Sequence, residues 1–318
     1  MNYEHSLIFY RTITPLHVGC GQEVGVVDLP VIRERSTGYP YIPGSGIRGS
    51  LREWFEKKGK EFKALTKKLF GPDEDEMEEA ENQYAGCLAV HDARLLFYPV
   101  RSDKEVFLWI TSPLVLERYK RDLSYFLSCA TANIEGLTDI GEDKYIGPAV
   151  LGNANQPFLH LEEFCFTPVA NSDDARTNLE ALAGNIAGKI EISELDKRVI
   201  LVSDTAFYHF VNHATMLVQH NTLTSAKTVK GGMLFSVESI PPETILYGMI
   251  GATKQRKPEN DDGGQNFSEP TATLSFLRSS LSGDPLKKQN YLHLGGKESI
   301  GMGVTQMTWV IYSGGMEL

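Results

Sequence analysis

One carboxylate, Asp28, stands between apolar residues in a stretch of the sequence that is rich in glycine. The stretch, VGCGQEVGVVDLPVIRERSTGYPYIPGSGIRGSLREWF, begins at Val18 and follows His17 directly. Carboxylates and histidines exchange protons, and carboxylates also hold divalent metals. Glycines let a backbone approach a phosphate closely. This combination indicates a site for a phosphate-bearing ligand.

The hexapeptide GSGIRG, from Gly44 to Gly49, formally matches the dinucleotide-binding pattern G-x-G-x-x-G. The acidic residue expected about 20 residues further on is missing, and Pro43 stands where a buried parallel strand would continue. A dinucleotide site is therefore disfavoured. An anion still suits the segment, because a helix N-terminus presents free N–H groups. The candidate contacts are Ser45, Gly46, Arg48 and Arg52, and the two arginines would share one helix face.

The sequence LGGKESIGMG, from Leu294 to Gly303, repeats the glycine-rich theme near the other end of the chain. Its spacing is not that of a Walker loop, which needs G-x-x-x-x-G-K-[ST]. By itself it is best explained as the turn of a hairpin. The functional alternative is a second loop that cradles a phosphate through Gly295, Gly296, Lys297 and Gly301.

Two other groups of residues could serve a ligand. His209 and His213 lie four apart on a predicted helix, but no third metal ligand is evident, so packed or surface histidines are favoured. The segment SAKTVKGG carries Lys227 and Lys230 and no acid. It is either a solvated turn or a finger that lies on a polyanion.

Strands and helices alternate irregularly along the chain, which predicts an α+β fold with hairpin insertions rather than a regular parallel sheet. Ser45 is a plausible N-cap for a helix from about Ile47 to Leu69, with a break near Gly59. Further helices are predicted in LVLERYKRDLSYFLSCA, DDARTNLEALAGNIAGKI, TATLSFLRSSLS and after a cap at Ser203 or Asp204 in VILVSDTAFYHFVNHATMLVQHN.

Apolar and polar residues alternate in the segments that are predicted to be strands. A basic hairpin followed by two strands is predicted in TLTSAKTVKGGMLFSVESIPPETILYGMIGA, and two strands flank the C-terminal glycine-rich turn. The remaining strand candidates are SLIFYRTITPLHV, GVVDLPVI, GCLAVHDARLLFYPV, EVFLWITSP and PFLHLEEFCFTP.

The formal net charge of −10 over 318 residues argues against a surface coated with nucleic acid. The charge is uneven, however. Residues 31–68 are basic, and an acidic run follows from Asp73 to Glu81. The simplest interpretation is a solvated helix and an acidic loop, but a local basic face can bind phosphate whatever the total charge.

The sequence predicts a cytoplasmic protein without a membrane segment. No apolar run approaches the roughly 20 residues that span a bilayer, and the N-terminus lacks the zones of a signal peptide. Cys20, Cys87, Cys129 and Cys165 are far apart and form no CxxC pair, so they are expected to be reduced thiols.

Taken together, these motifs resemble a known family. The segment TPLHVGCGQEVGVVDLPVIRERSTGYPYIPGSGIRGSLRE is similar to the N-terminal signature of the RAMP proteins of type III CRISPR systems. The closing LGGKESIGMG fits as well. The segments VGVVDLPVIRER and PPETILYG resemble the backbone subunit of type III-B (Cmr) complexes, with the type III-A (Csm) backbone subunit as the nearest relative.

The resemblance implies a single RAMP domain over residues 1–318 with an RRM-like (ferredoxin-like) palm and a protruding thumb hairpin near 220–235. Insertions are expected near 70–85, 155–198 and 252–270. It also implies a filament of copies on guide RNA, associated with other Cmr subunits. Each copy would cut bound single-stranded target RNA once, at six-nucleotide intervals.

In such a family the loop aspartate that matches Asp28 is needed for cutting, together with Mg²⁺ or Mn²⁺, and His17 could assist as an acid or by orienting the phosphate. The residues expected to contact RNA are Gly19, Gly21, Ser45, Gly46, Arg48, Arg52, Lys227, Lys230, Gly295, Gly296, Lys297 and Gly301. Cys20, Ser36, Gly46 and Arg48 depart from the residues common at these positions. A structural subunit that binds RNA without cutting, and a separate nucleotide-binding enzyme, are the alternatives.

Overall fold

The computed structural model describes residues 3–21, 27–59, 62–72, 84–127, 134–138, 140–151, 158–256, 265–282, 289–310, 312–313 and 316–317. The helices are α1 (Gly44–Lys57), α2 (Lys63–Phe70), α3 (Pro113–Leu127), α4 (Asp173–Ile190), α5 (Leu195–Arg198), α6 (Asp204–His213) and α7 (Pro270–Ser282), with short turns η4 (Ala149–Leu151) and η5 (Glu298–Ile300). Among these described residues, no helix is long and apolar enough to cross a membrane.

The strands of the main sheet are β1 (Glu4–Thr12), β2 (Tyr41–Ile42), β3 (Leu88–Val90), β4 (Ala93–Arg101), β5 (Phe107–Thr111), β6 (Lys144–Ile146), β7 (Leu159–Leu161), β8 (Phe164–Pro168), β9 (Val199–Val202), β12 (Ile245–Ala252), β13 (Gln289–His293) and β14 (Val304–Val310). Their order is β13-β14-β1-β12-β4-β5-β9-β6-β8-β7, while β2 pairs with β4 and β3 with β12. The short β15 (Tyr312–Ser313) and β16 (Met316–Glu317) pair with each other.

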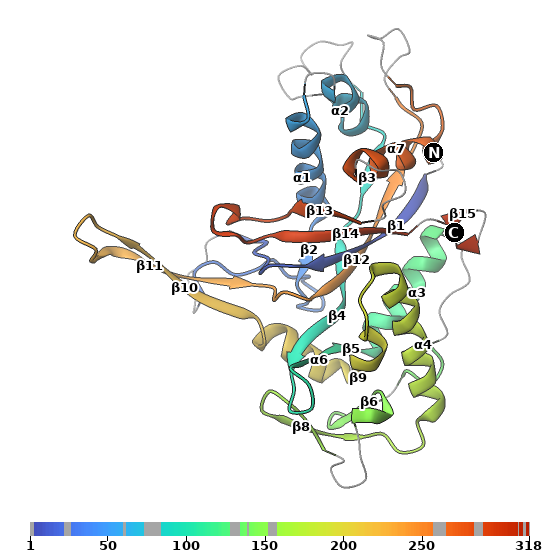
Figure 1. Cartoon of the computed structure of the whole chain (residues 1–318), viewed down its shortest axis with the longest axis vertical. Helices are drawn as coiled ribbons and strands as arrows, with labels where there is room; N and C mark the ends of the chain where they lie inside the picture. The colour runs from blue at the N-terminus through green and yellow to red at the C-terminus, as the bar shows by residue number, and fades with distance from the viewer. Residues whose placement is uncertain are drawn as a thin grey trace.

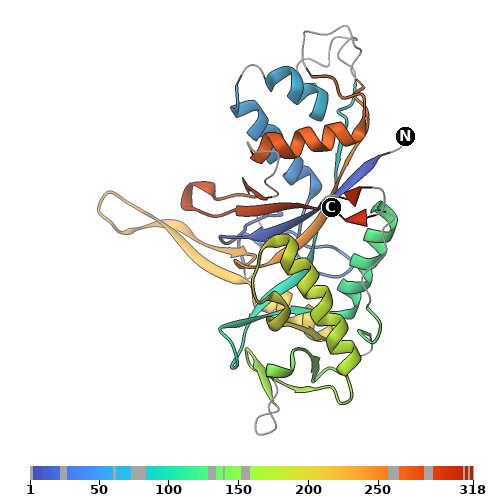
Figure 2. The same cartoon turned by 45° about the vertical axis from the view of Figure 1, so that its right-hand side comes forward.

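Strand β1 lies inside this sheet and pairs antiparallel with β12 on one side and β14 on the other. Alternation of apolar and polar residues does not hold in β1, because helices cover both faces and Leu7 to Tyr10 are all buried. On one face Tyr119 of α3 packs against Phe9 and Tyr247. Figures 1 and 2 show α1, α2 and α7 on the opposite side of these strands.

A long hairpin leaves this compact body. It consists of β10 (Met216–Leu223) and β11 (Val229–Ser239), which pair with each other in a two-stranded sheet separate from the main one. Figure 1 shows the hairpin projecting far to one side of the sheet. The hairpin covers residues 216–239 and is therefore longer than the predicted segment 220–235. One strand, β12, follows it directly, where two were expected.

Most predicted elements are confirmed, and three segments between residues 27 and 216 differ from the prediction. The predicted strand PFLHLEEFCFTP is a hairpin, because Glu162 adopts a positive φ and turns the chain between β7 and β8. The helix that starts after Ser203 ends at His213, and Met216 begins a strand. Residues 27–33 form isolated bridges instead of a named strand.

The break near Gly59 is confirmed, but Ser45 is not the N-cap of α1. The cap position is Pro43, and Asp92 supplies the hydrogen bond to the first N–H of the helix. Cys20, Cys87 and Cys165 are free thiols, while Cys129 lies outside the described residues. Outside them also lie the whole acidic run from Asp73 to Glu81, the linker residues 257–264 and Gly25.

Candidate functional site

Segments from both ends of the chain meet at the base of the hairpin. Leu16 exchanges two backbone hydrogen bonds with Ile240, at 2.9 and 2.8 Å, just after β11 ends. The N–H of Gly296 donates to the carbonyl of His17 at 2.8 Å. The segment 28–31 runs beside β11, with a parallel bridge from Leu29 to Val237. We call this meeting point of residues 15–19, 27–33, 236–240 and 294–303 the hairpin-root junction.

Asp28 is held at this junction by one residue of the hairpin, Ser236. The backbone N–H and the hydroxyl of Ser236 both donate to Asp28 Oδ2 at 2.8 Å, and the Asp28 N–H donates to Ser236 Oγ at 3.0 Å. The backbone bond from Ser236, followed by its hydroxyl, lowers the pKa of Asp28. The carboxylate is therefore ionised at neutral pH, and neither bond from Ser236 uses Oδ1.

His17 lies in the same junction and is 6% exposed. Its Nδ1 is 2.7 Å from the carbonyl oxygen of Glu238, and a carbonyl can only accept. Nδ1 therefore carries a proton, and in the neutral ring Nε2 is the acceptor. A Cβ on Gly19 would lie 2.7 Å from Nε2, so glycine at this position makes room for the imidazole.

Glu238 and Arg33 fasten the loop around Asp28, and sequence reasoning missed both. The Glu238 carboxylate accepts from the Val31 N–H at 2.9 Å and pairs with Arg33 at 2.6 Å. Its N–H donates to the carbonyl of Leu29 at 3.0 Å. The only signal in the sequence was a single acidic residue in an otherwise uncharged strand end, SVESI, which would be costly to bury without a cation.

The C-terminal glycine-rich loop, residues 294–303, closes over His17. Gly295 has φ +73°, and a Cβ there would lie 2.3 Å from the His17 carbonyl oxygen. The Lys297 ammonium lies 5.0 Å from the centre of the Phe235 ring on β11, in cation–π contact. Gly301 has φ +83° and open space around its Cα. The structure thus joins this loop to the loop that precedes Asp28.

The start of α1 offers a second, more open surface. Ser45, Gly46 and Gly49 are exposed, and a Cβ on either of these two glycines would meet nothing within 4 Å. Asp92 Oδ1 accepts from the Gly44 N–H at 2.7 Å, so a carboxylate already occupies part of the anion site at this N-terminus. Gly21, at the edge of the other loop, is likewise exposed with open space around it.

The two arginines of α1 make contacts within the protein. Arg48 donates to the carbonyl of Phe70, the last residue of α2, and burial, then the nearby Arg52, lowers the pKa of Arg48. Arg52 pairs with Glu56 one turn on at 2.8 Å. Arg48 therefore connects α1 to α2 through one of its five N–H groups and keeps the others for further contacts.

The hairpin tip carries the remaining basic candidates. Lys227 is exposed with φ +59°, and its N–H closes a turn on the carbonyl of Thr224 at 2.9 Å. Lys230 begins the return strand, and its side chain lies outside the described residues. These lysines lie at the end of the hairpin opposite to the junction that holds Asp28.

The donor set around Asp28 suits a divalent metal only in part. Among the described residues, no group of three His, Cys, Asp or Glu side chains could hold a metal ion. Asp28 offers one carboxylate, and Mg²⁺ is commonly bound by one or two carboxylates together with substrate phosphates. The site therefore fits Mg²⁺ only when a phosphate ligand supplies further oxygens. His209 and His213 have ring centres 4.5 Å apart but belong to no such group.

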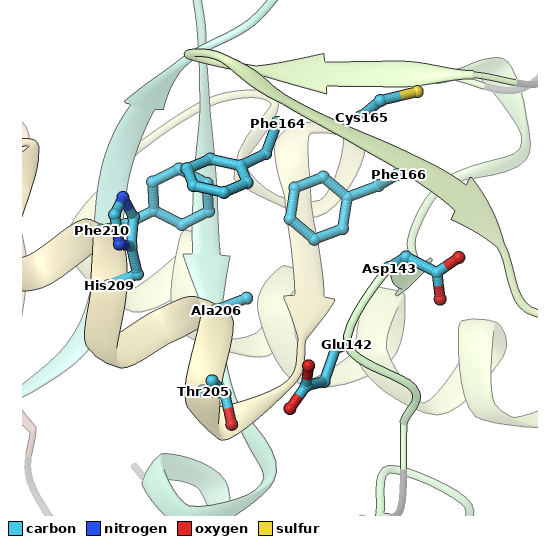
Figure 3. A pocket seen from close by; sticks show the side chains of 9 residues that line it. All are labelled: Glu142, Asp143, Phe164, Cys165, Phe166, Thr205, Ala206, His209 and Phe210. Carbon is cyan, nitrogen blue, oxygen red and sulfur yellow. The ribbon is translucent and has the colours of Figure 1, made fainter.

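A pocket of about 330 Å³ lies elsewhere, between α6 and β8 (Figure 3). Its walls are the rings of Phe164, Phe166 and Phe210, with His209 beside Phe164 and Glu142 at the mouth. Of the residues predicted to act on RNA, none lines it. The predicted site is thus a surface junction of loops rather than this pocket.

Comparison with known proteins places the chain in a family. Residues 9–306 match the RAMP superfamily. A protein of Pyrococcus furiosus named CRISPR system Cmr endoribonuclease Cmr4 is 32% identical over 308 residues, which cover 95% of this chain and 94% of that protein. The Saccharolobus solfataricus protein named CRISPR system CMR subunit Cmr4 is 23% identical and covers 95% of both chains.

Solved structures agree with this grouping. The crystal structure of oligomeric Cmr4 from Pyrococcus furiosus superposes with a TM-score of 0.67 at 27% identity and covers 100% of this chain and 99% of that chain. A chain in the cryo-EM structure of the type III-B Cmr-beta complex bound to cognate target RNA has the same fold, with a TM-score of 0.70 at 21% identity and 96% of each chain covered.

Proposed function

Because the chain belongs to the RAMP superfamily, and within it to the backbone subunits of type III-B Cmr complexes, we propose that it is a guide-dependent endoribonuclease subunit. Several copies bind one guide RNA in the cytoplasm together with other Cmr subunits. Each copy cuts the paired single-stranded target RNA once, so that cuts are six nucleotides apart. The Cmr4 relative from Pyrococcus furiosus carries the name endoribonuclease, which supports this activity.

The observation that carries the proposal is the hairpin-root junction. Two residues of β11 hold the two candidate side chains. Ser236 bonds Asp28, the carboxylate expected to be needed for cutting, and Glu238, two positions further on, bonds His17. Both side chains therefore keep a fixed relation to the hairpin. A site that must hold one phosphodiester in a reactive geometry requires such fixed groups.

The proposed reaction is attack by a ribose 2′-OH on its own 3′ phosphate. The O2′–P bond forms, the P–O5′ bond breaks, and the products are a 2′,3′-cyclic phosphate and a 5′-hydroxyl. The 2′-OH proton must leave, the 5′ oxygen must gain a proton, and the phosphate charge must be neutralised. Ionised Asp28, with its lowered pKa, is a weak base and is better suited to orient the 2′-OH or to hold a cation.

His17 supplies the group that exchanges protons. The Glu238 carbonyl keeps a proton on Nδ1, so Nε2 of the neutral ring accepts the 2′-OH proton, and Nε2 of the charged ring donates it to the departing 5′ oxygen. The contact with Gly19 sets the ring beside the glycine-rich loop that would approach the RNA backbone. Mg²⁺ or Mn²⁺, when held by Asp28 and RNA phosphate oxygens, would supply charge neutralisation at the scissile phosphate.

The guide RNA would lie on the open surfaces. Exposed Gly46 and Gly21 allow a phosphate to approach the backbone, and Arg48 and Lys297 present cations beside them. Ser45, Gly19, Arg52, Gly295, Gly296 and Gly301 would complete this contact, and Lys227 and Lys230 at the thumb tip would reach the RNA farther out.

The test is cleavage of an end-labelled target by the complex reconstituted with guide RNA and partner subunits, in Mg²⁺ and in EDTA. Wild-type protein should give fragments that differ by six nucleotides and end in cyclic phosphate. Asp28→Ala should give none and still bind target. Asp143→Ala, which removes a carboxylate at the rim of the distant pocket, is the matched control and should cut normally.

The alternative is a structural subunit that spaces guide and target without cutting. Tight target binding without fragments from either wild type or Asp28→Ala would establish this alternative. Fragments of unchanged length and yield in EDTA would contradict the metal requirement alone. Unchanged cutting by Asp28→Ala would contradict the assignment of the catalytic residue.

A further inference from the structure

We propose that Ser236, at the root of the β10–β11 hairpin, is the positioning residue for Asp28. It fixes the orientation of the carboxylate, so that Oδ2 is used inside the protein and Oδ1 is left for the reacting RNA. This inference rests on the proposed function, because it concerns how the cutting residue is held.

Three hydrogen bonds join Ser236 and Asp28. The N–H of Ser236 and its hydroxyl reach Asp28 Oδ2, and its Oγ accepts the Asp28 N–H. Its carbonyl accepts the N–H of Leu29 at 3.0 Å. One residue therefore uses every polar group it has on two consecutive residues of the loop. Ser236 is 8% exposed, which shields these bonds from competition with water.

Among the described contacts, Ser236 provides every hydrogen bond that another residue makes to the Asp28 carboxylate. The neighbouring bonds from Glu238 to Leu29 and Val31 fix the backbone of the loop but not this side chain. A single bond to Oδ2 would leave the carboxylate free to swing about its Cβ–Cγ bond. The second bond, from the hydroxyl, removes that freedom, so one oxygen faces Ser236 and the other faces away.

The position of Ser236 links this orientation to the hairpin. Ser236 stands opposite Gln219 of β10, so it belongs to the two-stranded ladder that extends outward to the tip. The loop with Asp28 runs alongside β11 as a third extended segment. Asp28 therefore moves with the hairpin. An RNA strand that displaces the hairpin would carry the carboxylate with it.

Serine has a specific advantage at this position. Its hydroxyl donates to a carboxylate and accepts an N–H at the same time, whereas alanine and glycine can do neither and cysteine does both weakly. Threonine keeps the hydroxyl and suits a strand. Ser236→Ala and Ser236→Thr thus separate loss of the hydroxyl from any change of the strand. Ser172→Ala, which removes a hydroxyl bonded to the Val169 carbonyl outside the hairpin-root junction, is the matched control.

The experiment uses the complex reconstituted with guide RNA and measures two quantities on the same preparation. One is the single-turnover rate of target cleavage at saturating complex, and the other is the target Kd. Ser236→Ala should cut about tenfold more slowly with an unchanged Kd, because the carboxylate loses the charge-assisted hydrogen bond that fixes its orientation. Ser236→Thr should restore most of the rate, and Ser172→Ala should match wild type.

Other outcomes would contradict either the positioning role of Ser236 or the proposed function. Wild-type cutting by Ser236→Ala would overturn the positioning role. A parallel loss of cutting and binding that threonine does not restore would also overturn it, because the residue would then only support the hairpin. Unchanged cutting by Asp28→Ala in the same assay would overturn the proposed function instead, so the two failures are distinguishable.

Discussion

The two glycine-rich stretches of this protein use glycine for opposite purposes. In the C-terminal loop, Gly295 lies against the protein itself, and a Cβ would lie 2.3 Å from the His17 carbonyl oxygen. At the start of α1, Gly46 and Gly49 face open space. The first glycine joins two distant segments of the chain, whereas the second pair leaves a surface bare.

Two similar glycine-rich motifs therefore have different structural roles, one in internal packing and one in an open surface. The close approach of Gly295 to the His17 carbonyl fixes His17 and its neighbours, so its loss should lower the free energy of unfolding. An open surface contributes nothing to folding by being bare, which agrees with the proposed contact with RNA. The two regions should respond to substitution with opposite signs in stability, and this can be measured.

The largest effect is expected for Gly295→Ala. The substitution forces a Cβ onto a backbone oxygen and imposes a side chain on a left-handed conformation, with φ +73°. We expect the free energy of unfolding to fall by about 3 kcal/mol, measured by urea denaturation. Gly301→Ala is the control, because φ is +83° but the space is open, and it should cost about 1 kcal/mol. Equal losses would show that the approach to His17 is unimportant.

Arg48→Ala should have the next largest effect. It removes the hydrogen bond to the last carbonyl of α2 and should lower the free energy of unfolding by about 1–2 kcal/mol. If its other N–H groups also hold phosphate, the slope of log K against log salt for guide binding should fall by about 0.7. A stability loss with an unchanged slope would make Arg48 a purely structural residue.

Gly46→Ala should change stability in the other direction. Alanine adds no clash here and favours a helix, so the unfolding free energy should rise by up to about 1 kcal/mol. Guide affinity, measured by filter binding at fixed salt, should fall because a methyl group now covers the bare backbone. Unchanged affinity would mean that the open surface at α1 is not a contact for RNA.

Lys297→Gln should have the smallest effect. The ammonium lies over Phe235 and is one cation among several, so stability should change by at most about 1 kcal/mol. The salt slope of guide binding should fall by about 0.7 if one phosphate contact is lost. The same slope as wild type would leave Lys297 as a partner of the hairpin only.

Much of the fold could be predicted because local signals agreed with the final structure. Helix α4 begins and ends where its acidic first turn and apolar spacing indicate, and β1, β4 and β5 follow their apolar runs. The predicted strand 157–168 failed because a turn at Glu162 leaves apolar residues on both sides of it, a pattern that one strand shares with a short hairpin.

The candidate site was only partly predictable, for a physical reason. Asp28, His17 and the glycines could be named from their residue types and from the resemblance. Ser236 and Glu238 could not, because their importance depends on pairing between residues more than 200 positions apart. Ser45 was wrongly expected to cap α1, because the side chain that bonds the first N–H of the helix, Asp92, comes from the link between β3 and β4.

The most direct test of the account is Asp28→Asn, which keeps the shape of the side chain and its contacts with Ser236 but removes the charge. Single-turnover cleavage and target Kd should be measured together in the reconstituted complex. If Asp28 is the residue needed for cutting, the rate should be at least about 10²-fold lower with an unchanged Kd. Cutting at the wild-type rate and at the same six-nucleotide spacing would contradict the account.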